Sequence, residues 1–175
     1  MEKKLFIADN VSGVEHCSLV NGIGLRTVVW FQGCSHHCCG CHNPDSWDVS
    51  KGFPISVDSL LTLAKPNCME DGITLSGGDP FDQPNLDLVV EFLQKYKKEN
   101  PDKTVIVYTG YTFEQLIQPN ENRAKLLGLV DWVIDGPFNA NLKSDKVSWR
   151  GSSNQRIIDV SKYIANGFIV SISDF

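Results

Sequence analysis

Long apolar runs and an excess of basic residues are both missing from this 175-residue sequence. A membrane-spanning helix needs about 20 consecutive apolar residues, and no stretch of the chain approaches that length. The apolar run Leu5–Ala8 stops at Asp9, which makes it too short for the apolar region of a secretory signal. The net charge of −5 argues against non-specific binding to nucleic acids or anionic membranes. These absences favour a cytoplasmic protein.

Internal repeats, linkers and low-complexity segments are also absent, so the sequence predicts a single domain over residues 1–175. A complete eight-fold β/α barrel typically needs about 250 residues and is not expected. No Ser-His-Asp order, phosphate-binding loop or basic aromatic patch is evident. The six cysteines, without an export signal, should stay reduced. That favours metal or redox chemistry over a disulfide framework.

Short apolar strands alternate with helical patterns along the chain. Strands are expected at residues 27–32, 72–76, 104–108 and 130–135, with an edge strand at 5–8 and further candidates at 157–158 and 168–172. Helices are expected, from apolar residues three and four apart, at residues 57–64, 86–98, 113–117 and 123–127. This alternation predicts βαβ units and the α/β class. The expected architecture is a partial (open) β/α barrel with a mostly parallel sheet.

A cluster of cysteines directly follows the strand expected at 27–32. Thiolates suit zinc, copper(I) or iron–sulfur clusters, and they serve hard cations poorly. The spacing Cys34-x3-Cys38-x2-Cys41 can supply three corners of a cubic cluster and leave the fourth iron open. A purely electron-carrying cluster usually has four cysteine ligands. The open iron would therefore be a place for a substrate to bind.

Other residues near this motif have weaker claims as ligands. Adjacent residues do not easily aim both sulfurs at one cluster, so Cys39 is interpreted as a non-ligand. His36 and His37 are expected to face solvent or to support the ligands. A structural zinc ion, which needs four closed ligands, remains the alternative, with Cys17, Cys39, Cys68 or a histidine as its fourth ligand. For Cys17 itself, a small buried hydrophobic side chain is the expectation.

Two glycine-containing turns follow the next two predicted strands, at Gly77–Pro80 and Thr109–Tyr111. Paired glycines let a ligand approach the backbone closely, and free carbonyls beside a carboxylate favour an ammonium group. A plain turn is the alternative for both segments. Their position at the same end of the sheet as the cysteine loop favours a shared site. Further along, Trp149–Gln155 is a polar, donor-rich stretch that could also be a solvated connection.

Together these motifs resemble the radical S-adenosylmethionine (SAM) superfamily. Its hallmark is similar to Cys34-x3-Cys38-x2-Cys41, and its amino-group-binding motif is similar to Gly77–Asp79, with Asp where Glu is commoner. Segments that resemble the glycyl-radical-enzyme activase branch are Asn21–Arg26, Phe31–Cys34, and Cys41–Pro44 with Trp47. Segments that resemble, within that branch, the family of anaerobic ribonucleoside-triphosphate reductase activases are Ser76–Pro80, Tyr108–Tyr111 and Trp149–Gln155.

The resemblance runs from about residue 21 to residue 155 and implies two cofactors. One [4Fe–4S] cluster per chain would be held by Cys34, Cys38 and Cys41, and SAM would chelate the open iron. Two residues depart from the superfamily pattern: Cys39 stands beside a ligand, and Gly40 replaces a common aromatic residue, although Gly40 suits this branch. Six residues are expected to contact SAM: Gly77, Gly78 and Asp79 at its amino group, and Gly40, Cys41 and His42 on its adenine side.

The resemblance also implies the reaction and the partners. SAM would be cleaved reductively to methionine and a 5′-deoxyadenosyl radical, which would take hydrogen from a glycine in the C-terminal loop of the reductase large subunit. A flavodoxin-like or other low-potential donor would supply the electron, and no catalytic side chain is nominated. The alternatives are an activase of another glycyl radical enzyme, a radical SAM enzyme acting on a free metabolite, and a non-catalytic zinc-binding interaction module.

Overall fold

A computed structural model describes residues 3–8 and 13–172; the ends of the predicted 1–175 domain and Asp9 lie outside these ranges. The strands β1 to β9 are Leu5–Ile7, Val14–Ser18, Arg26–Phe31, Phe53–Ile55, Gly72–Gly77, Thr104–Tyr108, Trp132–Asp135, Arg156–Asp159 and Ser171–Ile172. The helices α1 to α5 are Val57–Leu63, Leu86–Glu99, Phe113–Leu116, Glu121–Leu127 and Val160–Asn166. The short 3-10 helices η1 to η4 are Pro44–Ser46, Val49–Lys51, Pro80–Asp82 and Ala140–Leu142.

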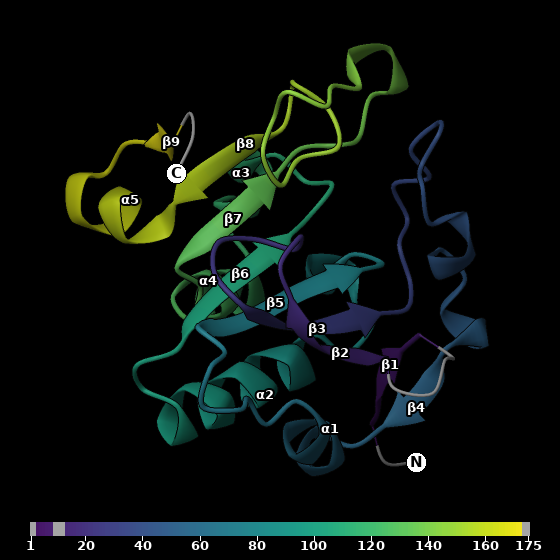
Figure 1. Ribbon diagram of the computed structural model, residues 1–175, viewed down its shortest axis with the longest axis vertical. Helices are drawn as coiled ribbons and strands as arrows, with labels where there is room; N and C mark the ends of the chain where they lie inside the picture. The colour runs from purple at the N-terminus through teal and green to yellow at the C-terminus, as the bar shows by residue number, and fades with distance from the viewer. Residues whose placement is uncertain (1–2, 9–12, 173–175) are drawn as a thin grey trace.

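The strands form one mixed sheet in the order β4-β1-β3-β5-β6-β7-β8-β9, with β2 also paired to β3 (Figure 1). Its centre, β3-β5-β6-β7, is parallel, and successive central strands are joined through α1, through α2, and through α3 with α4. The strands outside this centre pair antiparallel to their neighbours. The α/β class is therefore confirmed, and the parallel part of the sheet is its four-stranded centre.

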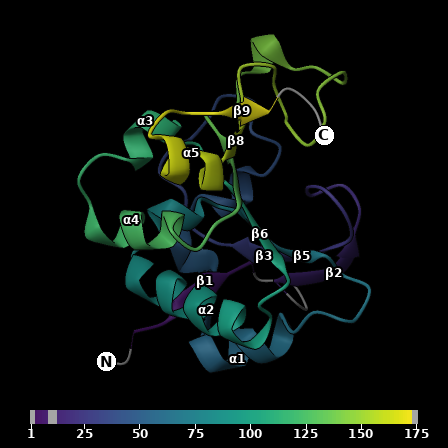
Figure 2. The ribbon, with the colours of Figure 1, turned by 90° about the vertical axis from the view of Figure 1, so that its left-hand side faces the viewer.

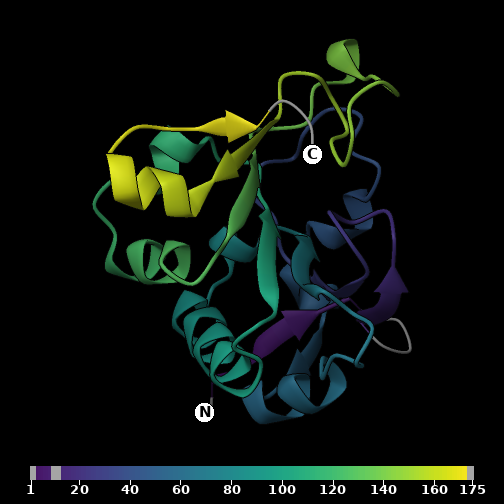
Figure 3. The same ribbon diagram turned by 60° about the vertical axis from the view of Figure 1, so that its left-hand side comes forward.

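Helices α1 to α4 gather on one side of the sheet (Figures 2 and 3). The expected apolar spacing of α2 is confirmed, because Val89, Phe92 and Leu93 are fully buried in the main core. Strand β6 shows the alternation of a strand covered on both faces, with Val105 facing the helices and Ile106 belonging to a second cluster. Of the helices in the described part of the chain, none has the length and apolar character needed to cross a bilayer.

The opposite face of the sheet is covered by loops rather than helices. Its buried cluster consists of Ile106, Ile134 and Ile157, against which Ile23, Tyr108, Trp132 and Trp149 pack. The loop between β2 and β3 approaches this cluster closely, since a Cβ on Gly22 would lie only 2.5 Å from Cδ1 of Ile106. Gly22 has φ +120, a conformation that favours glycine. The segment Asn21–Arg26, which carries part of the family resemblance, therefore packs directly on this face of the sheet through Gly22.

Several sequence predictions for the outer parts of the sheet are wrong or incomplete. Cys17 is exposed rather than buried, because β2 is irregular between Glu15 and Ser18 and Cys17 adopts φ +60. Strand β1 is not an edge strand, since β4, where no strand was expected, pairs along its outer side. The strand expected at 168–172 is reduced to β9, and helix α5 before it was not predicted.

Candidate active site

The cysteine loop begins where β3 ends, and its first residues are tied to the segment that follows the loop. The backbone N–H of Gly33 donates to the carbonyl oxygen of Ser46 over 2.8 Å, and that of Cys34 donates to Trp47 over 3.0 Å. The ring of His37 stacks on the ring of Trp47, with centroids 4.6 Å apart. Trp47, which the family resemblance singled out, thus binds the backbone of the first cysteine and packs on the exposed ring of His37.

A second set of contacts shapes the end of the loop. Cys41 N–H donates to the carbonyl oxygen of Cys38 over 3.0 Å, which closes a turn in which Gly40 adopts φ +77. A Cβ on Gly40 would lie 3.1 Å from Cβ of Ala140, so the turn packs against the segment after β7. The N–H of Asn43 lies 3.4 Å from Sγ of Cys41 and donates to it. Such a donor stabilises negative charge on a thiolate ligand.

One pocket brings the loop together with the carboxyl ends of the parallel strands. Its lining consists of Cys34, His36, Cys38, His42, Ser76, Gly77, Gly78, Asp79, Tyr108, Thr109, Gly110, Gly136, Phe138 and Gln155. Of the residues predicted to bind the cofactors, those in this lining are Cys34, Cys38, His42, Gly77, Gly78 and Asp79. Gly40 and Cys41, both described, are outside it. The cysteine loop, the two glycine turns and Gln155 therefore share one site.

The thiols of this loop differ in their surroundings. Cys34, Cys38 and Cys41 are free and half-buried, whereas Cys39 is free and exposed. Burial raises the pKa of the Cys34 thiol to about 11, and the carboxylate of Asp79 nearby acts in the same direction. A metal ligand at this position must lose its proton when the metal binds. Three half-buried thiols on one loop, with a donor on one sulfur, fit an iron–sulfur cluster.

The three thiols do not meet at one point. Within residues 3–8 and 13–172, no three His, Cys, Asp or Glu side chains converge so as to hold a single metal ion. A cubic cluster does not require such convergence, because each of its cysteine sulfurs binds a different iron.

Gly77 and Gly78 bring the ends of β3 and β5 into direct contact. A Cβ on Gly77 would lie 2.5 Å from the carbonyl oxygen of Phe31, and one on Gly78 would collide with the backbone of Gly33. Gly77 also adopts φ +93. Glycine is therefore required here for close packing of two backbones. Ligand access, the reason inferred from the sequence, is not needed to explain these residues.

Asp79 is buried and its carboxylate is occupied by donors of the protein. Oδ2 accepts hydrogen bonds from Thr109 Oγ1 and from the backbone N–H of Gly110, both over 2.8 Å. The same oxygen accepts from Nε2 of His36 over 2.7 Å, and Oδ1 accepts from the N–H of Phe81 over 2.9 Å. Only 2% of Asp79 is exposed. Asp79 thus joins the cysteine loop, the turn after β5 and the turn after β6.

A group of polar and aromatic side chains around His36 was not predicted. The His36 ring meets the Tyr111 ring edge to face, with centroids 4.5 Å apart. The guanidinium carbon of Arg123 lies 4.2 Å from the centroid of the Tyr111 ring. Tyr111 donates to Asp82, which also accepts from the backbone N–H of Ser35 over 2.6 Å. Hydrogen bonding to Asp79 raises the pKa of His36. These contacts join residues far apart in the sequence. The sequence pointed to this group only through the glycine-containing turn Thr109–Tyr111 after a predicted strand.

The stretch Trp149–Gln155 is attached to the end of β7 by its last two side chains. Gln155 Oε1 accepts from the N–H groups of Gly151 and Ser152, and Gln155 Nε2 donates to the carbonyl oxygen of Gly136 over 3.0 Å. Asn154 Nδ2 donates to the carbonyl oxygen of Pro137 over 2.8 Å. Gln155 also lines the pocket, whereas Gly151, Ser153 and Asn154 are exposed, so this stretch meets the site through Gln155.

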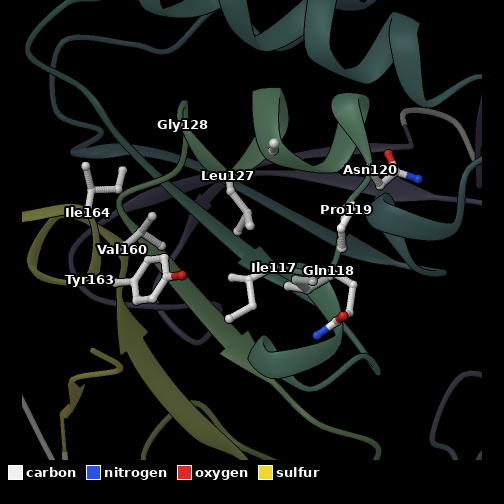
Figure 4. A pocket seen from close by; sticks show the side chains of 11 residues that line it. Ile117, Gln118, Pro119, Asn120, Leu127, Gly128, Val160, Tyr163 and Ile164 are labelled. Atoms are coloured by element: carbon white, nitrogen blue, oxygen red, sulfur yellow. The ribbon is translucent and has the colours of Figure 1, made fainter. Parts of the chain in front are cut away.

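A second hollow lies between the α3–α4 connection and α5 (Figure 4). Its walls are mainly apolar and include Ile117, Leu127, Val160 and Ile164, with Tyr163 among them. None of the cysteines or glycine turns contributes to it, so it is separate from the site at the carboxyl ends of the central strands.

Comparisons with known proteins identify the family of this chain. The family model of a 4Fe-4S single cluster domain matches residues 20–158. The chain is 36% identical over 149 residues to the anaerobic ribonucleoside-triphosphate reductase-activating protein of Pasteurella multocida strain Pm70, covering 83% of this chain and 94% of that protein. Proteins of the same name from Escherichia coli strain K12 and Enterobacteria phage T4 are 36% and 35% identical, over 78% and 85% of this chain and 90% and 92% of theirs. The chain therefore belongs to the family of anaerobic ribonucleoside-triphosphate reductase-activating proteins and contains a 4Fe-4S single cluster domain.

Proposed function

We propose that this chain is the radical SAM enzyme that creates the glycyl radical of anaerobic ribonucleoside-triphosphate reductase. The observation that carries the proposal is the shared pocket, in which Cys34 and Cys38 line the same hollow as the Gly77–Asp79 turn at the ends of the parallel strands. That arrangement puts a soft-metal ligand set beside a backbone turn suited to an ammonium group. A membership of the activase family supports the same activity.

The cluster would be held by Cys34, Cys38 and Cys41, with Cys39 left free. The three are half-buried, and Cys39 is exposed. Half-burial limits the access of water to the ligand sulfurs, and the N–H of Asn43 would stabilise the thiolate of Cys41. One iron would remain without a protein ligand, which is the position that SAM needs.

SAM would lie along the pocket with its methionine end toward β5. The backbone of Gly77 and Gly78 would receive the amino group beside Asp79, while His42 would line the adenine side from within the pocket and Gly40 and Cys41 would border it from the turn before His42. When bound, a reduced cluster would supply the electron for reductive cleavage of SAM to methionine and a 5′-deoxyadenosyl radical, and the α-carbon of a glycine in the reductase would give up the hydrogen atom. The protein's own task is to orient SAM and to exclude water.

The partner would present its glycine as a flexible C-terminal loop. The sheet does not close on itself, because the order of its strands ends at β4 on one side and at β9 on the other. We therefore expect it to act as a partial radical SAM barrel whose open side admits that loop. The stretch Trp149–Gln155 would receive the loop or seat SAM, since Gln155 lines the pocket. A flavodoxin-like or other low-potential protein would deliver the electron. We further propose that the whole chain forms one domain. A cytoplasmic location is proposed because six free thiols suit a reducing compartment.

Anoxic purification followed by spectroscopy tests this proposal. We expect a brown protein with iron and acid-labile sulfide, whose reduced EPR signal changes when SAM is added. With the reductase, a reductant and SAM, a glycyl radical and 5′-deoxyadenosine should form together. Colourless protein that retains one tightly bound zinc after cluster reconstitution would contradict the proposal. A radical on another glycyl radical enzyme, but not on the reductase, would correct the partner.

A further inference from the structure

We propose that His36 is a positioning residue that sets the cysteine loop against the amino-group end of the SAM site through Asp79. The inference rests on the proposed function, because it assumes that SAM binds at the turn after β5. It adds a role for a residue that lies between two cluster ligands in the sequence and is not itself a ligand. It also gives the Asp79 carboxylate a different task from the one its motif implies.

The hydrogen-bond inventory of Asp79 is the first part of the argument. A carboxylate has about four favourable acceptor sites, and four donors of the protein already point at this one. Three of the four, from His36, Thr109 and Gly110, converge on Oδ2. With 2% of the residue exposed, little of the carboxylate is open to a ligand. We infer that backbone groups at Gly77 and Gly78 receive the ammonium group, and that Asp79 holds the turn in place.

The seat of the His36 ring is the second part of the argument. A Cβ on Gly110 would lie 2.5 Å from Cδ2 of His36 and 2.9 Å from Nε2, so only glycine at this position leaves room for the ring. Tyr111 closes the other side in edge-to-face contact. Because the ring fills a fitted space and bonds a buried carboxylate over 2.7 Å, its position is defined by the fold. The cysteine loop is thereby fixed to the turns after β5 and β6.

The neighbouring histidine provides a matched comparison. His37 is exposed, and its ring stacks on Trp47; neither residue lines the pocket. Both histidines lie between Cys34 and Cys38, so substitutions at either place alter the same segment. Only His36 reaches the turn after β5. A difference between the two variants therefore reports the contact with Asp79 rather than a general disturbance of the loop.

The test uses cluster-loaded, anoxically prepared protein and measures the dissociation constant of SAM together with iron content. We expect His36→Ala to weaken SAM binding about tenfold, the effect of losing one charged hydrogen bond. His36→Gln, whose amide N–H can reach the same carboxylate oxygen, should recover most of the affinity. His37→Ala should bind SAM as the wild type does. Hydrogen exchange at residues 34–38, measured without SAM, should increase in His36→Ala alone.

Asp79→Asn separates positioning by Asp79 from direct contact with the ammonium group. Either role predicts weaker SAM binding, but only positioning predicts faster hydrogen exchange at residues 77–80 and 34–38 in protein without SAM, because the bonds that Asp79 makes lie within the protein. Weaker SAM binding with unchanged exchange would show direct contact and overturn this part of the inference. Loss of the cluster in His36→Ala but not in His36→Gln or His37→Ala would support the role of His36.

Two results would overturn the role of His36. One is unchanged affinity and exchange in His36→Ala, and the other is an equal defect in His36→Ala and His36→Gln. A wild-type protein that holds its cluster but binds no SAM would instead count against the proposed function, while the exchange measurement would still test the contact between His36 and Asp79.

Discussion

The backbone N–H of Asp79 donates a hydrogen bond to the carbonyl oxygen of Gly33 over 2.9 Å. This bond joins the end of β5 to the residue immediately before the first cysteine. The Gln83 amide also donates to the Gly33 carbonyl, over 3.3 Å. The start of the cysteine loop is therefore set by the turn after β5, and changes in that turn should reach the cluster site.

Gly78→Ala should disturb this junction. The new Cβ would collide with the backbone of Gly33, which cannot move without shifting Cys34. We expect the free energy of unfolding to fall by about 1–3 kcal/mol or more, and iron content to fall with it. Gly128→Ala is the control, because Gly128 has φ −64 and the nearest atoms to its added Cβ are at 3.5 Å. Urea unfolding and iron analysis measure both variants. Equal stability of the two would contradict the close packing.

Single cysteine substitutions should separate ligands from the non-ligand. Cys34→Ala, Cys38→Ala and Cys41→Ala should each abolish SAM cleavage, because a cubic cluster held by three thiolates loses a corner. Cys39→Ala should keep about four irons per chain and most of the cleavage activity, since the Cys39 thiol is exposed. Iron and sulfide analysis with quantification of 5′-deoxyadenosine decides the matter. Loss of the cluster in Cys39→Ala alone would reassign the ligand set.

Replacing Asn154 and Gln155 together by Ala should impair glycyl-radical formation. These side chains bind the Gly136 and Pro137 carbonyls and the N–H groups of the preceding turn. Their loss would loosen one wall of the pocket, and we expect the radical yield to drop about tenfold. Ser153→Ala is the control, because Ser153 is exposed and binds the carbonyl oxygen of Leu142 through its backbone N–H. EPR quantification at equal cluster content measures the effect, and an unchanged yield would remove the role assigned to Trp149–Gln155.

The parts of this molecule that depend on local sequence were predictable. Strand β6 and helix α2 begin at the residues where the sequence predicts them, 104 and 86. The signals for both, a β-branched run and helical spacing of apolar residues, are local properties of the sequence. The cysteine set could be proposed for the same reason, since its members lie in one short loop. Helix α5 also had local signals, an Asp159 side chain that accepts from Lys162 N–H and Gly167 at φ +74.

The contacts that organise the site were not predictable in this way. His36 and Asp79 are 43 residues apart, and their meeting depends on β5 lying next to β3 and on the length of both turns. Gly110 could be read as a turn residue, but its need to admit the His36 ring appears only in three dimensions. The exposure of Cys17 likewise follows from an irregular strand pairing that no periodicity reveals.

Acid should weaken the fold through the ion pairs of Arg156. This side chain donates to both carboxylate oxygens of Glu114, over 2.9 and 2.8 Å, and to the buried carboxylate of Asp135. The bonds from Arg156 lower the pKa of Glu114 from 4.5 to about 2. In the unfolded chain Glu114 takes up its proton first as pH falls, so its contribution is complete above about pH 4.5 and is lost toward pH 2.

Glu114→Gln should therefore remove part of the acid sensitivity. The variant should be less stable than the wild type near neutral pH, and the difference should shrink as the pH falls from about 4.5 toward 2. The effect should be small, because half of the Glu114 side chain is exposed and solvent screens the pair. Arg156→Ala should cost far more, about 3 kcal/mol, because it leaves the Asp135 carboxylate, 1% exposed, without its cation. Lys125→Ala, which breaks only the exposed pair with Glu121, is the matched control. Urea midpoints measured across this pH range would contradict the assignment if the Glu114→Gln difference stayed constant or grew toward acid.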